Sequence, residues 1–264
     1  MRVAAAPALE VLAPRALAGT VVAGDDDTAL LALFDDPPPR PAVGAHVRAI
    51  MVASLDGAAT GADGRSGSLG NAADRRLFGA LRALADVVLV GAGTVRTEGY
   101  ADVQVPDRLR AVRAARGRPD RVELAVVTGR GDLPDAVLDA GAVVLTTSTA
   151  PGLPALRERL GDERVIVADS PLPGVVDVTA GVRALVGRGL THVHAEGGPG
   201  LLREMLCAGL VDELCLTLSP LLVGGLARRR LVGDAGGNVA EPIRLELLHL
   251  LQGGHSLLGR WRVA

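Results

Sequence analysis

A predicted strand, a glycine turn and a predicted helix follow one another directly around residue 196, and this succession constrains the fold more than any other feature of the chain. The strand covers 191–195, Glu196-Gly197-Gly198 forms the turn, and apolar residues three and four apart predict a helix that ends at Gly209. The first N–H groups of a helix lack partners within it, and glycine lets an anion approach them closely. The segment therefore predicts an α/β unit that binds a phosphorylated ligand or a dinucleotide beside the carboxylate of Glu196.

Strand-like and helix-like segments alternate from residue 46 onward. Buried strands are predicted at 46–53, 87–90, 122–128, 142–146, 165–168 and 210–218, and helices at 71–84, 153–160 and 178–188. Two last strands, 244–251 and 256–263, are joined by a glycine turn and predict an antiparallel hairpin. We therefore expect a three-layer α/β/α domain over 46–264, with a mostly parallel sheet closed by a C-terminal antiparallel hairpin. Its ligand should lie at the carboxyl ends of the strands.

The first 45 residues have a weaker pattern than the rest of the chain. A short helix is predicted over 28–34, and the proline-rich run 35–41 interrupts regular structure. We expect residues 1–45 to form an N-terminal arm, or extension, that leads into the domain.

The composition excludes several classes of function. A net charge of −2 and 2% aromatic residues argue against nucleic acid as a partner. No apolar run reaches the roughly 18 residues that cross a membrane. We expect a cytoplasmic protein with a small-molecule substrate. The chain contains no lysine, which excludes a Schiff-base lysine and a Walker-A lysine. Any side-chain cation that holds a phosphate must therefore be arginine.

One motif suggests a metal site that the rest of the chain does not support. His194-Ala-Glu196 matches half of the zinc deaminase signature, which also requires P-C-x-x-C. Cys207 and Cys215 have no such motif, so we predict no metal and interpret both as buried thiols. The arginine-rich run 108–121 is interpreted as an exposed helix or loop, with an anion-binding lid as the alternative.

Four motifs stand at predicted strand ends: Ser54-Leu-Asp-Gly57, Gly91-Ala-Gly-Thr94, Thr128-Gly-Arg130 and Glu196-Gly-Gly198. Each alone has an ordinary explanation, since turns and helix N-caps use the same residues. Their order is more specific. Together with Gly64-Arg-Ser66, Leu81-Arg-Ala83 and Leu210-Val-Asp-Glu-Leu214, they resemble the pyrimidine reductase domain of bacterial riboflavin biosynthesis, in the stand-alone form known from actinobacteria.

The resemblance implies a dihydrofolate-reductase-like fold, an NADPH cofactor and a homodimer. It also implies reduction of the ribosylamino group of a pyrimidine ribose 5′-phosphate to a ribitylamino group, by hydride transfer to an imine carbon. The cofactor contacts that it implies are Val52, Ala53, Ser68, Thr94, Thr128, Gly129, Arg130, Gly197, Gly198, Pro199, Gly200 and Leu201. The substrate contacts that it implies are Ser66, Arg82, Glu98 and Glu196.

The residue types suit these implied roles. The diphosphate of the cofactor would lie on the N–H groups after the Gly-Gly pair, and Arg130 would meet the 2′-phosphate. Arg82 would pair with the ribose phosphate through two hydrogen bonds. Glu196 would hold the substrate or stabilise positive charge on the imine nitrogen. Asp56 is a second candidate acid, and the sequence does not separate the two.

The chain departs from the family pattern after Thr94. The family has Asp-Asp/Asn-Pro there, followed by Leu and Arg, whereas this chain has Glu98 near the first acid and neither the proline nor the trailing arginine. Two alternatives therefore stay open. One is a dihydrofolate- or pterin-type reductase on the same scaffold, and the other is a nucleotide-binding protein without catalysis.

Overall fold

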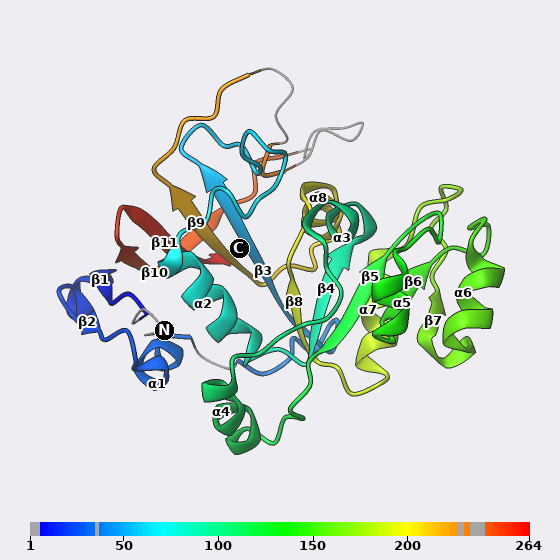
Figure 1. Cartoon of the computed structure of the whole chain (residues 1–264), viewed down its shortest axis with the longest axis horizontal. Helices are drawn as coiled ribbons and strands as arrows, with labels where there is room; N and C mark the ends of the chain where they lie inside the picture. Colours follow the sequence, from blue (N-terminus) through cyan, green and yellow to red (C-terminus); the bar gives the residue numbers. More distant parts are fainter. Residues whose placement is uncertain (1–5, 35–36, 226–229, 233–240) are drawn as a thin grey trace.

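The computed structural model of the chain describes residues 6–34, 37–225, 230–232 and 241–264. Within these residues a single 11-stranded sheet has the order β2-β1-β10-β11-β9-β3-β8-β4-β5-β6-β7 (Figure 1). Neighbours from β9 to β7 are parallel: β9 (Glu213–Ser219), β3 (His46–Ser54), β8 (His192–Ala195), β4 (Val87–Gly91), β5 (Glu123–Val127), β6 (Val143–Thr146) and β7 (Val165–Val167). The remaining strands pair antiparallel: β2 (Val21–Val22), β1 (Leu9–Ala13), β10 (Leu245–Gly253) and β11 (Ser256–Val263).

Helices connect the strands and cover the sheet. The α-helices are α1 (Asp27–Ala32), α2 (Ala72–Arg82), α3 (Ala92–Glu98), α4 (Arg110–Ala115), α5 (Asp135–Asp139), α6 (Leu153–Leu160), α7 (Val178–Val186) and α8 (Pro199–Cys207). Short 3-10 helices are η1 (Arg15–Leu17), η2 (Asp107–Leu109) and η3 (Asp162–Arg164). Asn71 caps the N-terminus of α2, because its side chain accepts a hydrogen bond from the Asp74 N–H at 2.9 Å. Among the described residues no helix is long and apolar enough to cross a membrane.

Alternate residues of the central strands divide between two apolar clusters, one on each face of the sheet. On β4, Val88 and Val90 belong to the cluster that contains α2, whereas Val87 and Leu89 belong to the cluster that contains α7 and α8. Because successive side chains of a strand point to opposite faces, a strand that is apolar at every position needs helices on both faces. The predicted three-layer arrangement, mostly parallel sheet and C-terminal antiparallel hairpin are confirmed.

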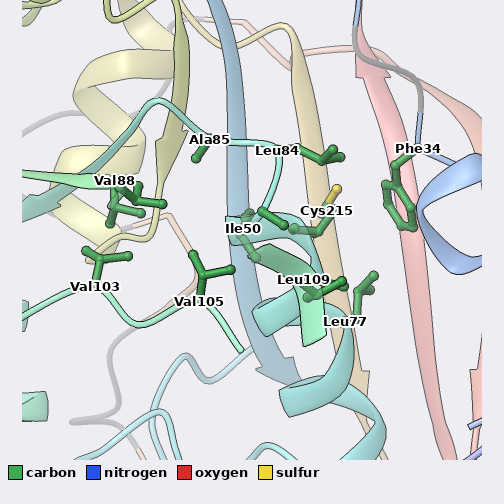
Figure 2. Close-up of a cluster of buried hydrophobic side chains, with 14 of the residues drawn as sticks. Phe34, Ile50, Leu77, Leu84, Ala85, Val88, Val103, Val105, Leu109 and Cys215 are labelled. Atoms are coloured by element: carbon green, nitrogen blue, oxygen red, sulfur yellow. The ribbon is translucent and has the colours of Figure 1, made fainter. Parts of the chain in front are cut away.

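The N-terminal segment is more regular than its sequence pattern predicts. It forms β1, β2 and α1, and β1 extends the sheet by pairing with β10 (Figure 1). Phe34, which follows α1, is buried in the same cluster as Leu77 of α2 and Cys215 of β9 (Figure 2). The helix predicted over 28–34 is observed as α1, and the described part of the arm, which excludes residues 1–5 and 35–36, also adds two strands to the sheet.

Arg76 of α2 is the physical reason for this order. Its buried guanidinium pairs with Asp27 at 3.1 Å and donates hydrogen bonds to the carbonyl oxygens of Pro7, Ala23 and Asp26 at 2.8, 2.7 and 3.1 Å. A buried arginine satisfied in this way fixes three points of the segment against α2. These contacts join residues 49 to 69 positions apart, so no local pattern reveals them.

Two further sequence interpretations need correction. Cys207 is exposed, because α8 turns Leu201, Leu202 and Met205 toward the sheet and position 207 lies on another side of the helix. The arginine-rich run is not simply exposed, since Arg113 is fully buried. Its guanidinium donates to carbonyl oxygens at the C-terminal end of α2, including that of Ala85 at 2.6 Å.

Candidate active site

A pocket of about 570 Å³ opens at the carboxyl-end half of β3. It is lined by 50–52 of β3, by the face of α2 that carries Phe78 and Arg82, by α3 with the segment that follows it, and by 196–199. Residues around 59–67, in the loop between β3 and α2, complete the wall. We call this cavity the pocket. Its place at the carboxyl ends of parallel strands is where α/β folds hold their ligands.

A buried three-residue network forms one wall of the pocket. Arg82 donates from Nε to Glu196 Oε1 at 2.8 Å and from Nη2 to Glu196 Oε2 at 2.6 Å. The Tyr100 hydroxyl also donates to Oε2, at 2.7 Å. The Glu196 side chain is 1% exposed and that of Arg82 is 13% exposed. Two-point pairing with arginine, plus one hydroxyl, satisfies most of the acceptor capacity of this carboxylate.

The network shifts the pKa values of Arg82 and Tyr100. Burial favours the neutral form of Arg82, but the hydrogen bonds and charge of Glu196 outweigh burial, so the pKa of Arg82 lies above its usual value. Burial and then the negative charge of Glu196 hold the pKa of Tyr100 well above its usual range. Arg82 is therefore a fixed cation, and Tyr100 is a neutral hydrogen-bond donor near neutral pH.

Aromatic rings are concentrated at this wall. The chain has one Trp, one Tyr and two Phe residues, and Phe78 and Tyr100 both line the pocket. The Arg82 guanidinium lies 4.3 Å from the centroid of the Phe78 ring and 5.7 Å from that of Tyr100. Cation–π contacts of this kind hold the guanidinium plane in place. The wall offers flat apolar surface beside a fixed charge pair, which suits a planar polar heterocycle.

The glycine turn before α8 closely approaches α3. The Gly91 N–H donates to the Gly197 carbonyl at 2.8 Å, and the peptide bond between Gly197 and Gly198 is cis. A Cβ atom added to Gly198 would lie 2.6 Å from Oγ1 of Thr94. Gly198 is also the N-cap of α8 and contributes no side-chain cap. Pro199, the first residue of α8, has no N–H group, so the donors at this helix start are the N–H groups of Gly198, Gly200 and Leu201, of which only Gly198 lines the pocket. The anion site at this helix start stays a prediction.

The implied cofactor residues of the glycine turn and its surroundings fall into two groups. Val52, Thr94, Gly197, Gly198 and Pro199 line the pocket. Ala53 is buried, and Leu201 packs in the cluster beneath α8; neither these two nor Ser68 and Gly200 line it.

The residues after β5 lie apart from the pocket lining. Thr128 Oγ1 accepts hydrogen bonds from the N–H groups of Arg130 and Gly131, at 3.3 and 3.0 Å, and so shapes the turn. A Cβ atom at Gly129 would lie 2.3 Å from the Gly174 carbonyl oxygen, so this position needs glycine. The Arg130 side chain is exposed. The turn is joined to the pocket side through α3, because Arg96 donates to the Asp132 carbonyl at 3.0 Å.

Two of the implied substrate residues, Ser66 and Glu98, are hydrogen-bonded to each other. Glu98 Oε1 accepts a hydrogen bond from the Ser66 N–H at 2.7 Å, and both residues line the pocket. Ser68 instead donates to Asp63 at 2.8 Å and stays outside the lining. Glu98 thus ties the loop before α2 to the end of α3. In the segment where the chain departs from its family, Val103 is buried in the core and Tyr100 completes the network around Glu196.

The two candidate acids have different surroundings. Asp56 is exposed and does not line the pocket; it accepts hydrogen bonds from Ser54 Oγ at 2.5 Å and from the Gly224 N–H at 2.7 Å. These bonds, that of Ser54 first, lower the pKa of Asp56 to about 2. Asp56 joins the turn after β3 to the segment after β9. Glu196 alone of the two faces the cavity.

Sequence reasoning missed Tyr100 and Phe78. The signal for Phe78 was available, because it precedes Arg82 by four residues on the same predicted helix and so lies on the same face. For Tyr100 the only signal in the sequence was its position after Thr94, in the segment where the chain departs from the family pattern. Within the described residues no group of three or more His, Cys, Asp or Glu side chains is arranged to hold a metal ion.

Comparisons with known proteins agree with this geometry. Residues 45–258 match the sequence profile described as RibD C-terminal domain. The chain is 31% identical over 217 residues to 2,5-diamino-6-ribosylamino-4(3H)-pyrimidinone 5′-phosphate reductase of Methanothermobacter thermautotrophicus. The aligned region covers 80% of this chain and 94% of that protein. It is 29% identical over 214 residues to the riboflavin biosynthesis protein RibD of Mycobacterium tuberculosis, covering 81% of this chain and 53% of that protein.

A solved structure is similar over almost its whole length. A pyrimidine reductase-like protein from Corynebacterium diphtheriae superimposes with a TM-score of 0.72 at 27% identity, covering 89% of this chain and 98% of that one. The chain thus spans nearly all of the Methanothermobacter and Corynebacterium proteins but only about half of the mycobacterial RibD protein.

Proposed function

This chain belongs to the RibD C-terminal domain family, and from that premise we propose that it is an NADPH-dependent reductase of a pyrimidine ribose 5′-phosphate. The reaction would convert the ribosylamino group of the substrate to a ribitylamino group. One observation supports this more than any other. The buried Arg82–Glu196–Tyr100 network and the Gly197-Gly198 turn that begins α8 line the same pocket, so the acid and the proposed diphosphate site would face one ligand space.

The residues at the α8 end of the pocket fit a nicotinamide dinucleotide. The absence of a side chain at Gly198 leaves room beside Thr94 where a Cβ atom would intrude. The N–H groups of Gly198, Gly200 and Leu201 would then bind the diphosphate. Arg130, exposed after β5, would supply the cation for a 2′-phosphate. NADPH, when bound, supplies a hydride to the electrophilic carbon, and the protein supplies position and charge.

The opposite wall fits the pyrimidine. Its ring would lie against the aromatic surface of Phe78 and Tyr100. Arg82 and Tyr100 use three acceptor positions of the Glu196 carboxylate, and a carboxylate has about four, which leaves one for an N–H group of the substrate. Glu196 would hold the nitrogen next to the reacting carbon and stabilise its positive charge as the imine forms. Arg82 keeps the carboxylate oriented through its two hydrogen bonds.

Turnover tests the proposal directly. The purified protein is mixed with NADPH and either the pyrimidine ribose phosphate or dihydrofolate, and NADPH oxidation is followed by absorbance. Oxidation with the pyrimidine substrate and a ribitylamino product identified by mass spectrometry is the expected result. Turnover with dihydrofolate alone would identify a pterin-type reductase, and NADPH binding without turnover on either substrate would identify a nucleotide-binding protein.

The assembly and the location implied by the resemblance belong to the same proposal. We propose a homodimer that works in the cytoplasm. Light scattering coupled to size-exclusion chromatography measures the first, and fractionation of cells that express the protein measures the second.

A further inference from the structure

Asp74 places a second carboxylate at the pocket, from the first turn of α2. It is half-buried and has no part in the hydride transfer, for which Glu196 would hold the nitrogen next to the reacting carbon. A carboxylate that has lost much of its water needs hydrogen-bond donors in return. The donors that the protein and a ligand can offer to Asp74 therefore bear on what the pocket binds.

The protein itself stabilises the charge of Asp74 incompletely. Burial raises the pKa of Asp74, and a hydrogen bond from the hydroxyl group of Thr217 and the positive charge of Arg75 lower it by less. Thr217 is a buried residue of β9, so its hydroxyl group orients the carboxylate from the sheet side. A carboxylate accepts about four hydrogen bonds, so acceptor positions beyond the bond from Thr217 can take N–H groups of a ligand in the pocket.

The spacing of residues on α2 relates Asp74 to the proposed substrate. Asp74, Phe78 and Arg82 follow one another at intervals of four residues, and all three line the pocket. Glu196 is held at the Arg82 end of this row, so Phe78 lies between two carboxylates. Eight residues of α-helix span about 12 Å, an interval that one six-membered ring with a hydrogen bond at each end can bridge. A ring that lies on Phe78 and presents its amino substituent to Glu196 therefore turns its opposite edge toward Asp74.

The edge opposite the ribosylamino substituent is where pyrimidines differ. In a 2-aminopyrimidin-4-one this edge carries two adjacent N–H donors, the ring N3–H and the 2-amino group, which can meet both oxygens of one carboxylate. In a uracil the 2-amino group is replaced by a carbonyl oxygen, which would lie against a carboxylate oxygen and be repelled by it. A carboxylate at this place thus favours the 2-amino ring over the 2-oxo ring.

We propose that Asp74 binds the N3–H and 2-amino groups of the pyrimidine, so that the substrate is a 2-aminopyrimidin-4-one ribosylamine phosphate rather than the corresponding uracil compound. The inference rests on the proposed function, because it names the pyrimidine of that reaction. It makes Asp74 a specificity-determining residue and leaves the hydride transfer to the Glu196 end of the pocket.

Steady-state kinetics tests the assignment with two ribosylamine phosphates that differ only in the 2-amino or 2-oxo group. The wild type should show a kcat/KM about tenfold to a hundredfold higher for the 2-amino compound, the usual effect of a hydrogen bond to a charged group. Asp74→Asn should abolish or reverse this preference, because an amide offers one acceptor and one donor, which match the N3–H and 2-oxo groups of the uracil. A wild type that does not prefer the 2-amino compound, or an unchanged preference in Asp74→Asn, would overturn the proposal.

Asp102→Asn is the matched control, because Asp102 is another carboxylate that lines the pocket but lies after α3. It removes the same charge and should leave the preference at its wild-type value, whereas a loss equal to that in Asp74→Asn would overturn the proposal. Thr217→Val keeps the Asp74 carboxylate and removes the hydroxyl that orients it, so the preference should fall, but by less. Circular dichroism monitors folding. If Asp74→Asn does not fold, a reduced preference in Thr217→Val supports the proposal and an unchanged one overturns it.

A binding measurement separates this inference from the proposed function. The free bases 6-aminoisocytosine and 6-aminouracil, which differ only in the 2-amino or 2-oxo group, are titrated calorimetrically into the wild type and Asp74→Asn. The wild type should bind 6-aminoisocytosine more tightly, and Asp74→Asn should lose this difference. Absence of turnover with either ribosylamine phosphate would refute the proposed function and leave this titration to decide on Asp74. Equal affinities of the wild type for the two bases, or no binding of either, would overturn the assignment of Asp74.

Discussion

Arg82 and Glu196 are 114 residues apart in the sequence and meet as a two-point ion pair, with Nε–Oε1 and Nη2–Oε2 distances of 2.8 and 2.6 Å. The pair joins the last residue of α2 to the residue that follows β8. Tyr100, from the segment after α3, adds a third bond to the same carboxylate. Three separate parts of the chain thus fix one acid at the wall of the pocket, and the predictions below test what that acid and its surroundings do.

Glu196→Gln should lower kcat/KM for the substrate by about a hundredfold to a thousandfold, the usual effect of losing a preorganised electrostatic contact. Glutamine keeps the size and one acceptor oxygen but removes the charge that would face the imine nitrogen. NADPH affinity should change little. Glu123→Gln is the control, because Glu123 pairs with Arg164 at 2.8 Å away from the pocket. A Glu196→Gln enzyme with wild-type kcat/KM would remove Glu196 from the mechanism.

Tyr100→Phe should lower kcat/KM by about tenfold to a hundredfold, because it removes a hydrogen bond to a charged carboxylate while keeping the ring. The double variant Tyr100→Phe/Glu196→Gln should lose less than the product of the two single effects, since both changes act on one network. Strictly multiplicative effects in the kinetic cycle would contradict a shared role.

Gly198→Ala should weaken NADPH binding at least tenfold, because the added Cβ atom would lie 2.6 Å from Thr94 Oγ1, at the start of α8 where the diphosphate must approach. Fluorescence titration with NADPH measures the change. Gly187→Ala is the control, because Gly187 lies at the end of α7, does not line the pocket, and a Cβ atom there would come no closer than 3.5 Å to its neighbours. Similar affinities for the two variants, both folded by circular dichroism, would exclude the proposed anion site.

Arg130→Ala should reduce affinity for NADPH about tenfold to a hundredfold while leaving affinity for NADH unchanged, because only NADPH carries the 2′-phosphate that Arg130 would meet. Arg188→Ala, another exposed arginine that lies at the end of α7, serves as control. If the ratio of the two dissociation constants stays at its wild-type value in Arg130→Ala, a different residue selects the cofactor.

His249 should make the protein less stable in mild acid. Burial lowers the pKa of His249 to about 4, against about 6.5 in an unfolded chain. Between these values the unfolded state binds a proton that the folded state does not, so the free energy of unfolding falls as pH falls from 6.5 to 4. The two pKa values correspond to a contribution of about 3 kcal/mol.

Urea unfolding at a series of pH values measures this dependence. His249→Gln should flatten the curve in that window, and the rest of the slope should include His194, whose pKa burial also lowers. His255→Gln is the matched control, because His255 is exposed in the turn between β10 and β11. A wild-type slope in His249→Gln would show that its protonation is not linked to folding.

Local sequence patterns predicted most of the fold. The uninterrupted apolar run of β4 indicates a strand buried on both faces, Asn71 indicates where α2 begins, and the Gly-Gly pair indicates the turn before α8. Each of these signals depends on periodicity or backbone freedom within a few residues, which a sequence displays directly. The place of Glu196 at the end of a strand, and so at the site, followed from the same reasoning.

Long-range partners could not be obtained in that way. The sequence contains Arg82, Tyr100 and Glu196, but only the packing of α2 and of the segment after α3 around the end of β8 decides that they bond to one another. The same holds for Arg76, which orders the N-terminal segment through contacts with distant carbonyl groups. The sequence shows where an arginine is placed but does not identify the anion that it pairs with. Which anion it meets, as Arg82 meets the internal carboxylate of Glu196, depends on burial and geometry that exist only once the chain has folded.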